Sequence, residues 1–203
     1  MPVSFCISEY VYVGACRRQA FFRGFYMNFK AKIMDEAAIR RSMARITHEI
    51  IEKNRGVSDI CLLGIKRRGI PLAAMLAENL KRFEGVEVPM GHIDITRYRD
   101  DLTEDMPVTE SSEFPCAIED KNVIIVDDVI YTGRTARAAI EAVFNYGRPK
   151  SIQLAVLVDR GHRELPIRPD FVGKNIPTSH EELVSVMLEG VDEETGVCLY
   201  HIG

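Results

Sequence analysis

The sequence predicts a fold of the α/β class, a doubly wound and mostly parallel sheet flanked by helices. Apolar runs at residues 123–126 and 154–158 are nearly continuous, which is typical of strands buried on both faces of a parallel sheet. Segments with helical patterning alternate with the apolar runs, in the order 60–65, 71–83, 90–96, 123–126, 135–146 and 151–158. This alternation of strand and helix is the pattern of an α/β protein.

A helix is predicted within residues 35–55, ahead of the first of these strands. Four apolar residues recur at steps of four, three and four, which stacks them on one side of a helix: Ile39, Met43, Ile46 and Ile50. Asp35 is the expected N-cap and Gly56 the expected C-terminal stop. The opposite side collects charged residues: Arg41, Arg45, His48, Glu52 and Arg55.

Composition limits the class of protein. A chain of 203 residues with 46% hydrophobic residues suits one globular domain with a sizeable core. The net charge of -4 gives no general attraction for nucleic acid, so any polyanion site must be a local patch. Five scattered cysteines without a C-x-x-C pair argue against a disulfide framework or structural zinc and predict a cytoplasmic protein. No apolar run reaches the roughly 18 residues of a membrane span.

Residues 1–26 are predicted to be an N-terminal extension of doubtful status, either read from an upstream start or disordered. Arg17 and Arg18 follow the apolar run at 10–16, whereas a signal peptide has its basic residues before that run. Met27 could equally be the true start, because regular patterning begins only after it. Residues 27–203 are therefore predicted to form the single folded domain.

The run of residues 123–135 carries the strongest functional signal. A buried strand ends in Asp127 and Asp128, and a turn from Thr132 to Thr135 then opens a helix. Backbone N–H groups and hydroxyls at a helix N-terminus suit a phosphate, and Gly133 lets the backbone come close to it. Two adjacent carboxylates can accept hydrogen bonds from two sugar hydroxyls, so the motif describes a ribose 5-phosphate. The alternative is a solvated strand end followed by an ordinary Thr132 N-cap.

A second loop, residues 64–69, follows the first strand of the sheet. Lys66, Arg67 and Arg68 stand between two glycines, and arginine can hold phosphate oxygens in a bidentate fork. Such a loop suits pyrophosphate, and the alternative is a basic surface turn. The sequence has neither a Walker A motif nor a G-x-G-x-x-G motif.

Residues 123–135 resemble the PRPP-binding signature of type I phosphoribosyltransferases (PRPP is 5-phosphoribosyl diphosphate). Residues 157–166 and 173–179 resemble the PyrR family, which are bifunctional pyrimidine operon attenuators and uracil phosphoribosyltransferases; the likeness extends from Met27 to the end of the chain. The resemblance implies the type I phosphoribosyltransferase fold, with a small hood over the strand ends. Residues 96–101 resemble the flexible loop that covers the reacting centre and keeps water from an oxocarbenium-like ribose.

The resemblance also implies the roles of individual residues. Four are expected to be catalytic: Asp127, Asp128, Arg67 and Arg99. The PRPP and nucleotide site is expected to comprise Lys66, Arg67, Arg68, Asp127, Asp128, Val129, Tyr131, Thr132, Gly133, Arg134 and Thr135. The base is expected to meet the hood at Val158, Asp159, Arg160 and Ile176.

The implied reaction joins uracil to PRPP, giving UMP and pyrophosphate, and it needs no nucleophilic side chain. Mg²⁺ is expected as the cofactor, held mainly through PRPP oxygens rather than by a dedicated protein cluster. Two alternatives stay open, an enzyme for another base such as hypoxanthine or orotate, and a nucleotide sensor without turnover.

The resemblance implies a second partner, a leader mRNA hairpin bound in a UMP-dependent way. The candidate RNA surface is a local set of basic residues: Arg41, Arg45, His48, Lys53, His162, Arg168 and Lys174, with Arg55 and Arg163 nearby. The alternative is a solvated helix face and a charged loop. Glu49 and Glu52 lie on the same helix, and Ala44 stands where the family often has a hydroxyl residue. A homo-oligomer, a dimer or higher, is expected, and no membrane partner.

Overall fold

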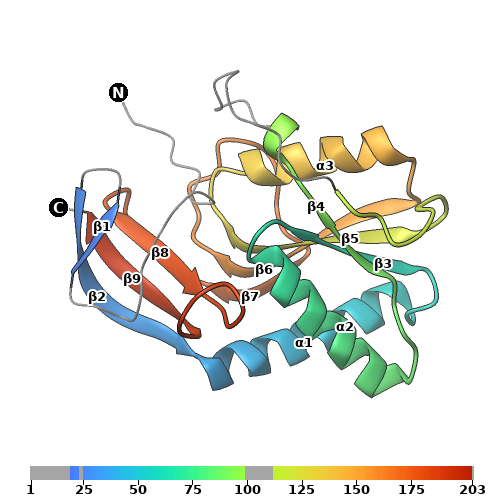
Figure 1. The fold of residues 1–203 in the computed structure, drawn as a ribbon, viewed down its shortest axis with the longest axis horizontal. Coiled ribbons are helices and arrows are strands. Elements are labelled where there is room, and N and C mark those ends of the chain that lie inside the picture. The colour runs from blue at the N-terminus through green and yellow to red at the C-terminus, as the bar shows by residue number, and fades with distance from the viewer. Residues whose placement is uncertain (1–18, 23–24, 99–111, 203) are drawn as a thin grey trace.

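The computed structural model describes residues 19–22, 25–98 and 112–202, which form two sheets (Figure 1). The larger sheet has five parallel strands in the order β4-β3-β5-β6-β7, which confirms the predicted α/β class. Its strands are β3 (Ile60–Ile65), β4 (Met90–Ile93), β5 (Asn122–Ile130), β6 (Ser151–Asp159) and β7 (Phe171–Asn175). The smaller sheet is antiparallel, with β1 (Gln19–Phe22), β2 (Phe25–Asp35), β9 (Gly196–Ile202) and β8 (Glu182–Met187) in that order.

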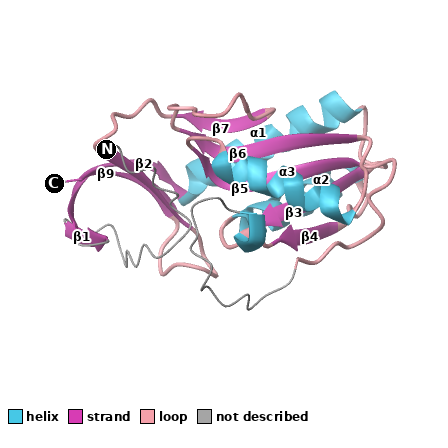
Figure 2. Cartoon of the chain, turned by 90° about the horizontal axis from the view of Figure 1, so that it is seen from above, coloured by secondary structure: helices cyan, strands magenta, loops and turns pink. Residues whose placement is uncertain are grey.

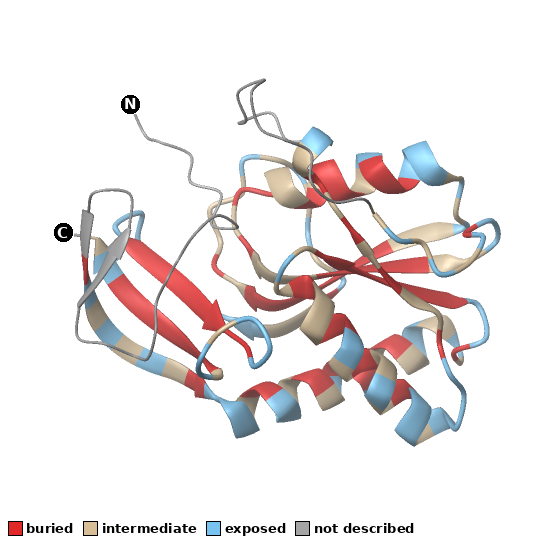
Figure 3. Cartoon of the chain, viewed as in Figure 1, coloured by how far each residue is buried: buried red, intermediate tan, exposed pale blue. Residues whose placement is uncertain are grey.

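Helices cover both faces of the parallel sheet (Figure 1), and Figure 2 shows the strands of that sheet side by side from above. They are α1 (Glu36–Asn54), α2 (Gly69–Glu84) and α3 (Arg134–Tyr146), with a short 3-10 helix η1 (Thr96–Tyr98). Alternate residues of each strand point to opposite faces. Leu62 and Ile124 pack with α1 and α2, whereas Leu63 and Ile125 pack with α3. The sheet is therefore buried on both faces, as Figure 3 shows by colour.

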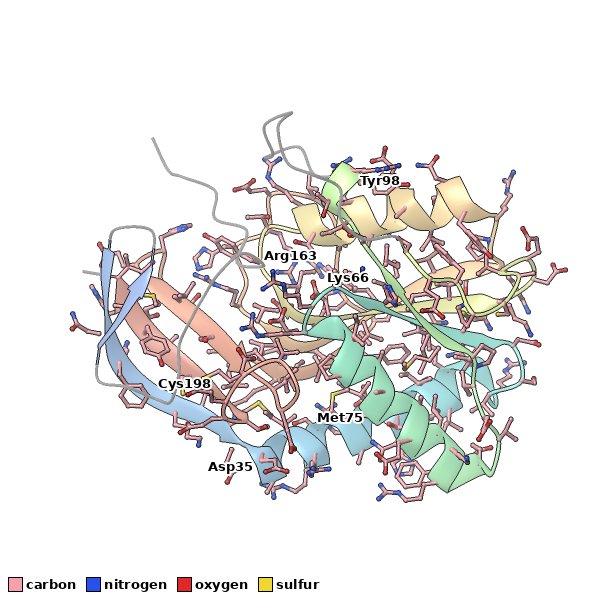
Figure 4. The ribbon with its side chains drawn as sticks, viewed as in Figure 1. Asp35, Lys66, Met75, Tyr98, Arg163 and Cys198 are labelled. Carbon is pink, nitrogen blue, oxygen red and sulfur yellow. The ribbon has the colours of Figure 1, made fainter. Side chains whose placement is uncertain are left out.

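Helix α1 confirms the predicted apolar stripe, and its ends show one correction. The side chain of Asp35 accepts a hydrogen bond from the Ala38 N–H at 2.7 Å, so it is the N-cap (labelled in Figure 4). The C-cap is Arg55, in the left-handed region at φ 56°, rather than the expected Gly56. Gly56 follows it at φ 119° and donates its N–H to Ile51 O at 3.0 Å. The helix therefore ends one residue earlier than predicted.

The smaller sheet includes residues that the sequence placed in the N-terminal extension. Strand β1 pairs with β2, and β2 begins at Phe25, two residues before the predicted boundary. Met27 is 1% exposed and packs against Tyr200 of β9, in a small hydrophobic core that is separate from the cores of the parallel sheet. Residues 1–18 and 23–24, where the rest of the extension falls, lie outside the described residues. The division at residue 27 stays a prediction.

Two cysteines of the described residues, Cys61 and Cys116, are free thiols. Burial, and after it the neighbouring Cys116, raises the pKa of the Cys61 thiol to about 12, so that thiol is unreactive at neutral pH. Within the described residues, no helix is both long and apolar enough to cross a bilayer.

Candidate active site

A pocket opens where the carboxyl ends of β3 and β5 meet. After β3 the chain forms β4, which pairs with one edge of β3, and then crosses over to form β5, which pairs with the other edge of β3. Such a reversal of strand order leaves a crevice at the carboxyl ends, which is where α/β proteins bind ligands. Residues 65–68 after β3 and 127–133 at the end of β5 line this pocket, with Thr135, Ala136, Leu154 and Val156. The structure thus brings together the two loops that the sequence singled out.

The two predicted acids lie side by side on β5, half-buried in the pocket wall. The Asp128 N–H donates to Asp127 Oδ1 at 2.9 Å, and the Val129 N–H donates to Asp128 Oδ1 at 2.8 Å. Burial raises the pKa of Asp127 well above its ordinary range, and the charge of Asp128 raises it further. Burial also raises the pKa of Asp128, although the nearby Arg68 opposes this rise. Two carboxylates this close resist being ionised together.

The turn after β5 has the form expected of a phosphate cradle. Gly133 is the N-cap of α3 at φ 96°, and no side chain caps the helix. The alternative in which Thr132 is an ordinary N-cap is therefore wrong. Thr132 Oγ1 instead lies 3.4 Å from the Arg134 N–H. The N-terminus of a helix attracts an anion through its first N–H groups and through the positive end of its dipole.

The cationic loop packs closely on the end of β5. A Cβ atom on Gly69 would lie 2.3 Å from Val126 O, and one on Gly64 would lie 2.7 Å from Gly69 O. Only glycine allows this approach, which places residues 66–68 opposite the acids. The Lys66–Arg67 peptide bond is cis. The close approaches at Gly64 and Gly69 thus bring both predicted loops to the rim of one pocket.

The three cations of this loop have different surroundings. Arg67 is exposed, and Lys66 Nζ lies 4.0 Å from Asp94 Oδ2. Arg68 donates from Nε and Nη2 to the two carboxylate oxygens of Asp192, at 3.0 and 2.7 Å. Sequence reasoning assigned no role to Asp192, because it lies in the smaller sheet's β8–β9 turn, far along the chain from Arg68.

The predicted hood residues lie at the end of β6 and beside it, and none of the four lines the pocket. Val158 and Ile176 are buried. The Asp159 carboxylate accepts from the Gly161 N–H at 2.9 Å and from Arg163 Nη2 at 2.6 Å. Arg160 is 3% exposed, donates to Glu182 O at 2.6 Å, and lies over the Tyr131 ring at 4.1 Å. Asp159 and Arg160 therefore hold the hood in place, and their contact with a base stays a prediction.

Residues 161–168, here called the strap, are bonded directly to the phosphate turn. Thr132 O accepts from the N–H groups of Glu164 and Leu165, at 3.0 and 3.1 Å. Arg134, expected in the nucleotide site, instead pairs with Glu164 at 2.8 Å and is not among the pocket residues. Arg163, labelled in Figure 4, donates to Tyr131 O at 2.8 Å. Arg163 is thus an internal brace of the cradle.

The structure places the residues of the predicted RNA surface on more than one part of the molecule. Lys53 pairs with Asp170, and Arg45 donates to the carbonyls of Val172 and Gly173, at 2.8 and 2.7 Å. Helix α1 therefore runs antiparallel to β7, which puts Arg41, one turn before Arg45, on the side of Lys174.

Two histidines do not belong to this α1–β7 surface, which comprises Arg41, Arg45, Lys53 and Lys174. His48 stacks on Phe83 of α2, with ring centroids 4.4 Å apart, so its ring is directed toward α2 rather than toward β7. His162 lies in the strap, with Nε2 2.5 Å from Thr178 O. Arg168 is exposed in the segment before β7. Of the predicted cover, residues 96–101, the first three form η1, and residues 99–101, including Arg99, lie outside the described residues.

The fold and the pocket together define a phosphoribosyltransferase, and the phosphoribosyl transferase domain family matches residues 31–189 of the chain. Solved structures of the same fold include a hypoxanthine phosphoribosyltransferase from Trypanosoma cruzi, with a TM-score of 0.67 and 24% identity, covering 84% of this chain and 95% of that one. A hypoxanthine-guanine phosphoribosyltransferase from Bacillus anthracis has a TM-score of 0.64 and 18% identity, over 86% of this chain and 98% of that one. At these identities the likeness shows the fold alone.

Curated relatives identify the family more closely. A protein of Clostridium acetobutylicum named bifunctional protein PyrR is 57% identical over 178 residues, which cover 87% of this chain and all of that protein. A protein of the same name from Acetivibrio thermocellus is 59% identical over 165 residues, 80% of this chain and 90% of that protein. The chain belongs to the PyrR family, as its sequence motifs indicated.

Proposed function

We propose that this protein transfers the phosphoribosyl group of PRPP to uracil, and that its UMP-bound form binds a leader mRNA hairpin that controls transcription of pyrimidine genes. The observation that carries the first activity is the meeting of the acid pair, the phosphate turn and the cationic loop at one switch point. Membership of the bifunctional PyrR family supports the second activity.

Each wall of the pocket has one task in this reaction. The N-terminus of α3 and the hydroxyls of Thr132 and Thr135 hold the 5-phosphate. Asp127 and Asp128 accept the two ribose hydroxyls and stabilise the electron-poor sugar. The bond from C1 to the pyrophosphate oxygen breaks, the bond from C1 to the ring nitrogen of uracil forms, and the proton of that nitrogen passes to the departing pyrophosphate. The protein contributes orientation and electrostatic stabilisation rather than a nucleophile.

Positive charge at the leaving group comes from the loop opposite the acids. Lys66 and Arg67 line the pocket on this side and are placed to bind the departing pyrophosphate. Arg99, expected to close over the reaction, belongs to this proposal on sequence alone.

The residues present fit a magnesium ion that arrives with PRPP. Mg²⁺ prefers oxygen ligands in an octahedron and commonly keeps several waters. Asp127 and Asp128 offer carboxylate oxygens beside the pocket, and the described residues contain no group of three or more acids, histidines and cysteines that could hold a metal. When bound, the ion would neutralise charge on the pyrophosphate.

Turnover with labelled bases tests the enzymatic proposal. The full-length protein with PRPP and Mg²⁺ is expected to convert uracil to UMP and to convert hypoxanthine and orotate at least about a hundredfold more slowly, because a site built to pair with one base leaves polar groups unpaired with another. Chromatographic separation of labelled nucleotides measures this. Preferential use of another base would overturn the assignment of uracil, and PRPP binding without turnover of any base would favour a sensor.

The RNA proposal is tested best at Lys174, since Arg45 is also bonded to the backbone of β7. Lys174 is exposed on the α1–β7 surface. Lys174→Ala is expected to weaken binding of the hairpin several-fold in the presence of UMP, and to reduce the slope of log Kd against log salt by about one. Uracil turnover should stay unchanged.

The matched control for this test is Lys150→Ala, another exposed lysine, which lies just before β6 at the opposite end of the strands. Filter binding or anisotropy at four salt concentrations measures both variants. Equal losses of RNA affinity in the two variants would mean that general charge accounts for the effect. They would overturn the proposal that the α1–β7 surface binds RNA.

The state and location of the protein complete the proposal. A homo-oligomer is expected from the membership of the family. Light scattering after gel filtration measures the molar mass and so tests this expectation. A cytoplasmic location follows from the proposed substrates and from the leader mRNA, both of which occur there.

A further inference from the structure

Asp192 joins the smaller sheet to the active-site rim. It lies in the turn between β8 and β9, on a different sheet from the pocket. Its two carboxylate oxygens accept from two nitrogens of the Arg68 guanidinium, at 3.0 and 2.7 Å. Both side chains are largely buried, Asp192 at 9% exposure and Arg68 at 14%. A bidentate pair of this kind fixes the plane of the guanidinium as well as its distance.

The carboxylate of Asp192 is itself held by its own turn. Asp192 Oδ2 also accepts from the Leu188 N–H at 3.0 Å, and the Asp192 N–H donates to Leu188 O at 2.8 Å. Asp192 therefore reaches the pocket as part of a braced turn rather than as a mobile surface acid. The position of Arg68 is set from the smaller sheet.

The guanidinium held in this way faces the reacting centre. Arg68 lines the pocket together with Asp127 and Asp128. Its charge is felt by Asp128, because it lowers the pKa of that carboxyl against the effect of burial. Nε and Nη2 of Arg68 both donate to Asp192, so the guanidinium cannot rotate freely toward solvent. Arg68 thus stands between an anchoring acid on one side and the catalytic acids on the other.

We propose that Asp192 is a positioning residue, which holds Arg68 in the orientation that the pyrophosphate side of the pocket requires. The inference rests on the proposed use of PRPP. Asp192 acts through Arg68 and does not itself contact the substrate. A residue that only stabilises the fold would lower the melting temperature and leave the affinity of correctly folded protein for PRPP unchanged.

The experiment compares Asp192→Asn with Glu193→Gln in the full-length protein. Both changes remove one negative charge from the same turn, but Glu193 is exposed and is not one of the residues that contact Arg68. Asp192→Asn is expected to raise the Kd for PRPP, measured by calorimetry with Mg²⁺, and the KM for PRPP about tenfold, while kcat falls less than about threefold. Glu193→Gln should leave all three values within about twofold of the parent protein.

A double-mutant cycle separates action through Arg68 from action by another route. Arg68→Lys keeps the charge but cannot form the bidentate fork. In that background, Asp192→Asn is expected to change the Kd for PRPP by less than about twofold, since the interaction is already lost. Independent, multiplying effects of the two changes would overturn the proposal.

The remaining outcomes are also decisive. An Asp192→Asn variant that binds PRPP as tightly as the parent protein, or more tightly, would overturn the inference and leave the proposed function standing. A parent protein that binds no PRPP would remove the proposed function, and the inference with it. Should Asp192→Asn fail to fold, Asp192→Glu keeps the charge and displaces the carboxylate by one methylene, and the same rise in Kd is expected.

Discussion

Asp127→Asn is expected to lower kcat/KM for PRPP by at least about a hundredfold and to leave the protein as stable as before, or more stable, at neutral pH. Asp127 offers a charged acceptor to a ribose hydroxyl and to the developing positive charge of the sugar, and an amide supplies neither to the same degree. In the protein without substrate, the same carboxylate is half-buried beside Asp128. This partial burial and the neighbouring charge raise its pKa and cost stability whenever both acids are ionised.

The sign of the pH dependence follows from this raised pKa. A carboxyl whose pKa is higher in the folded than in the unfolded state, where it is about 3.9, stabilises the fold at low pH and loses that contribution as pH rises through the folded value. Asp127→Asn removes this loss. The variant should therefore melt at a higher temperature than the parent protein near pH 8, with the difference disappearing toward pH 3.

Thermal unfolding by circular dichroism at several pH values, together with steady-state kinetics, measures both effects. Asp59→Asn is the matched control, because Asp59 is an exposed acid just before β3, at the opposite end of the strand from the pocket. It should change neither activity nor the pH dependence of melting. Full turnover by Asp127→Asn would remove that acid from the catalytic centre.

Gly69→Ala is expected to abolish most turnover through a single methyl group. A Cβ atom there would lie 2.3 Å from Val126 O, a backbone atom in the middle of β5 that cannot move without carrying the adjacent Asp127 with it. The loop of residues 66–68 must then separate from the acids, and misplacement by about 1 Å can cost about a hundredfold in rate. A similar loss is expected in affinity for PRPP, together with a lower melting temperature.

The control for this change lies at the other end of the same helix. Gly85 is the C-cap of α2 at φ 72°, and a Cβ atom there would meet nothing within 4 Å. Gly85→Ala is expected to cost about 1 kcal/mol through its left-handed backbone alone, with turnover retained. Kinetics and urea unfolding of both variants distinguish the two mechanisms. If Gly69→Ala retained the activity of the parent protein, the close approach of loop and strand would have no catalytic importance.

The parallel sheet and the pocket were predictable because their signals are local. The run 123–135 contains a buried strand, two acids and a helix start in one stretch, and the residues that it was expected to bring to the pocket line it, with the exception of Arg134. Periodicity likewise predicted α1, with an error of one residue at the C-cap. These features depend on neighbours within a few residues, which a sequence displays directly.

The misses all depend on contacts between distant parts of the chain. Nothing near Asp192 indicates that it pairs with Arg68, and nothing near Arg163 indicates that it braces Tyr131. His48 shares a charged helix face with Arg45, but Phe83 of another helix decides which way it lies. The strands β7, β8 and β9 were not predicted, because short strands are stabilised mainly by pairing and packing with neighbours that are distant in the sequence.

The pairing of β2 with β9 sets the order in which the molecule can assemble. Asp35 pairs with Gly196, and nearly the whole described chain lies between them. Closing so long a loop is entropically costly and slow, whereas the pairs of the parallel sheet join segments much closer in sequence. A nascent chain can therefore build its parallel sheet well before Asp192 reaches Arg68. We therefore expect a newly synthesised chain to form its central fold first and to complete its substrate-binding site last.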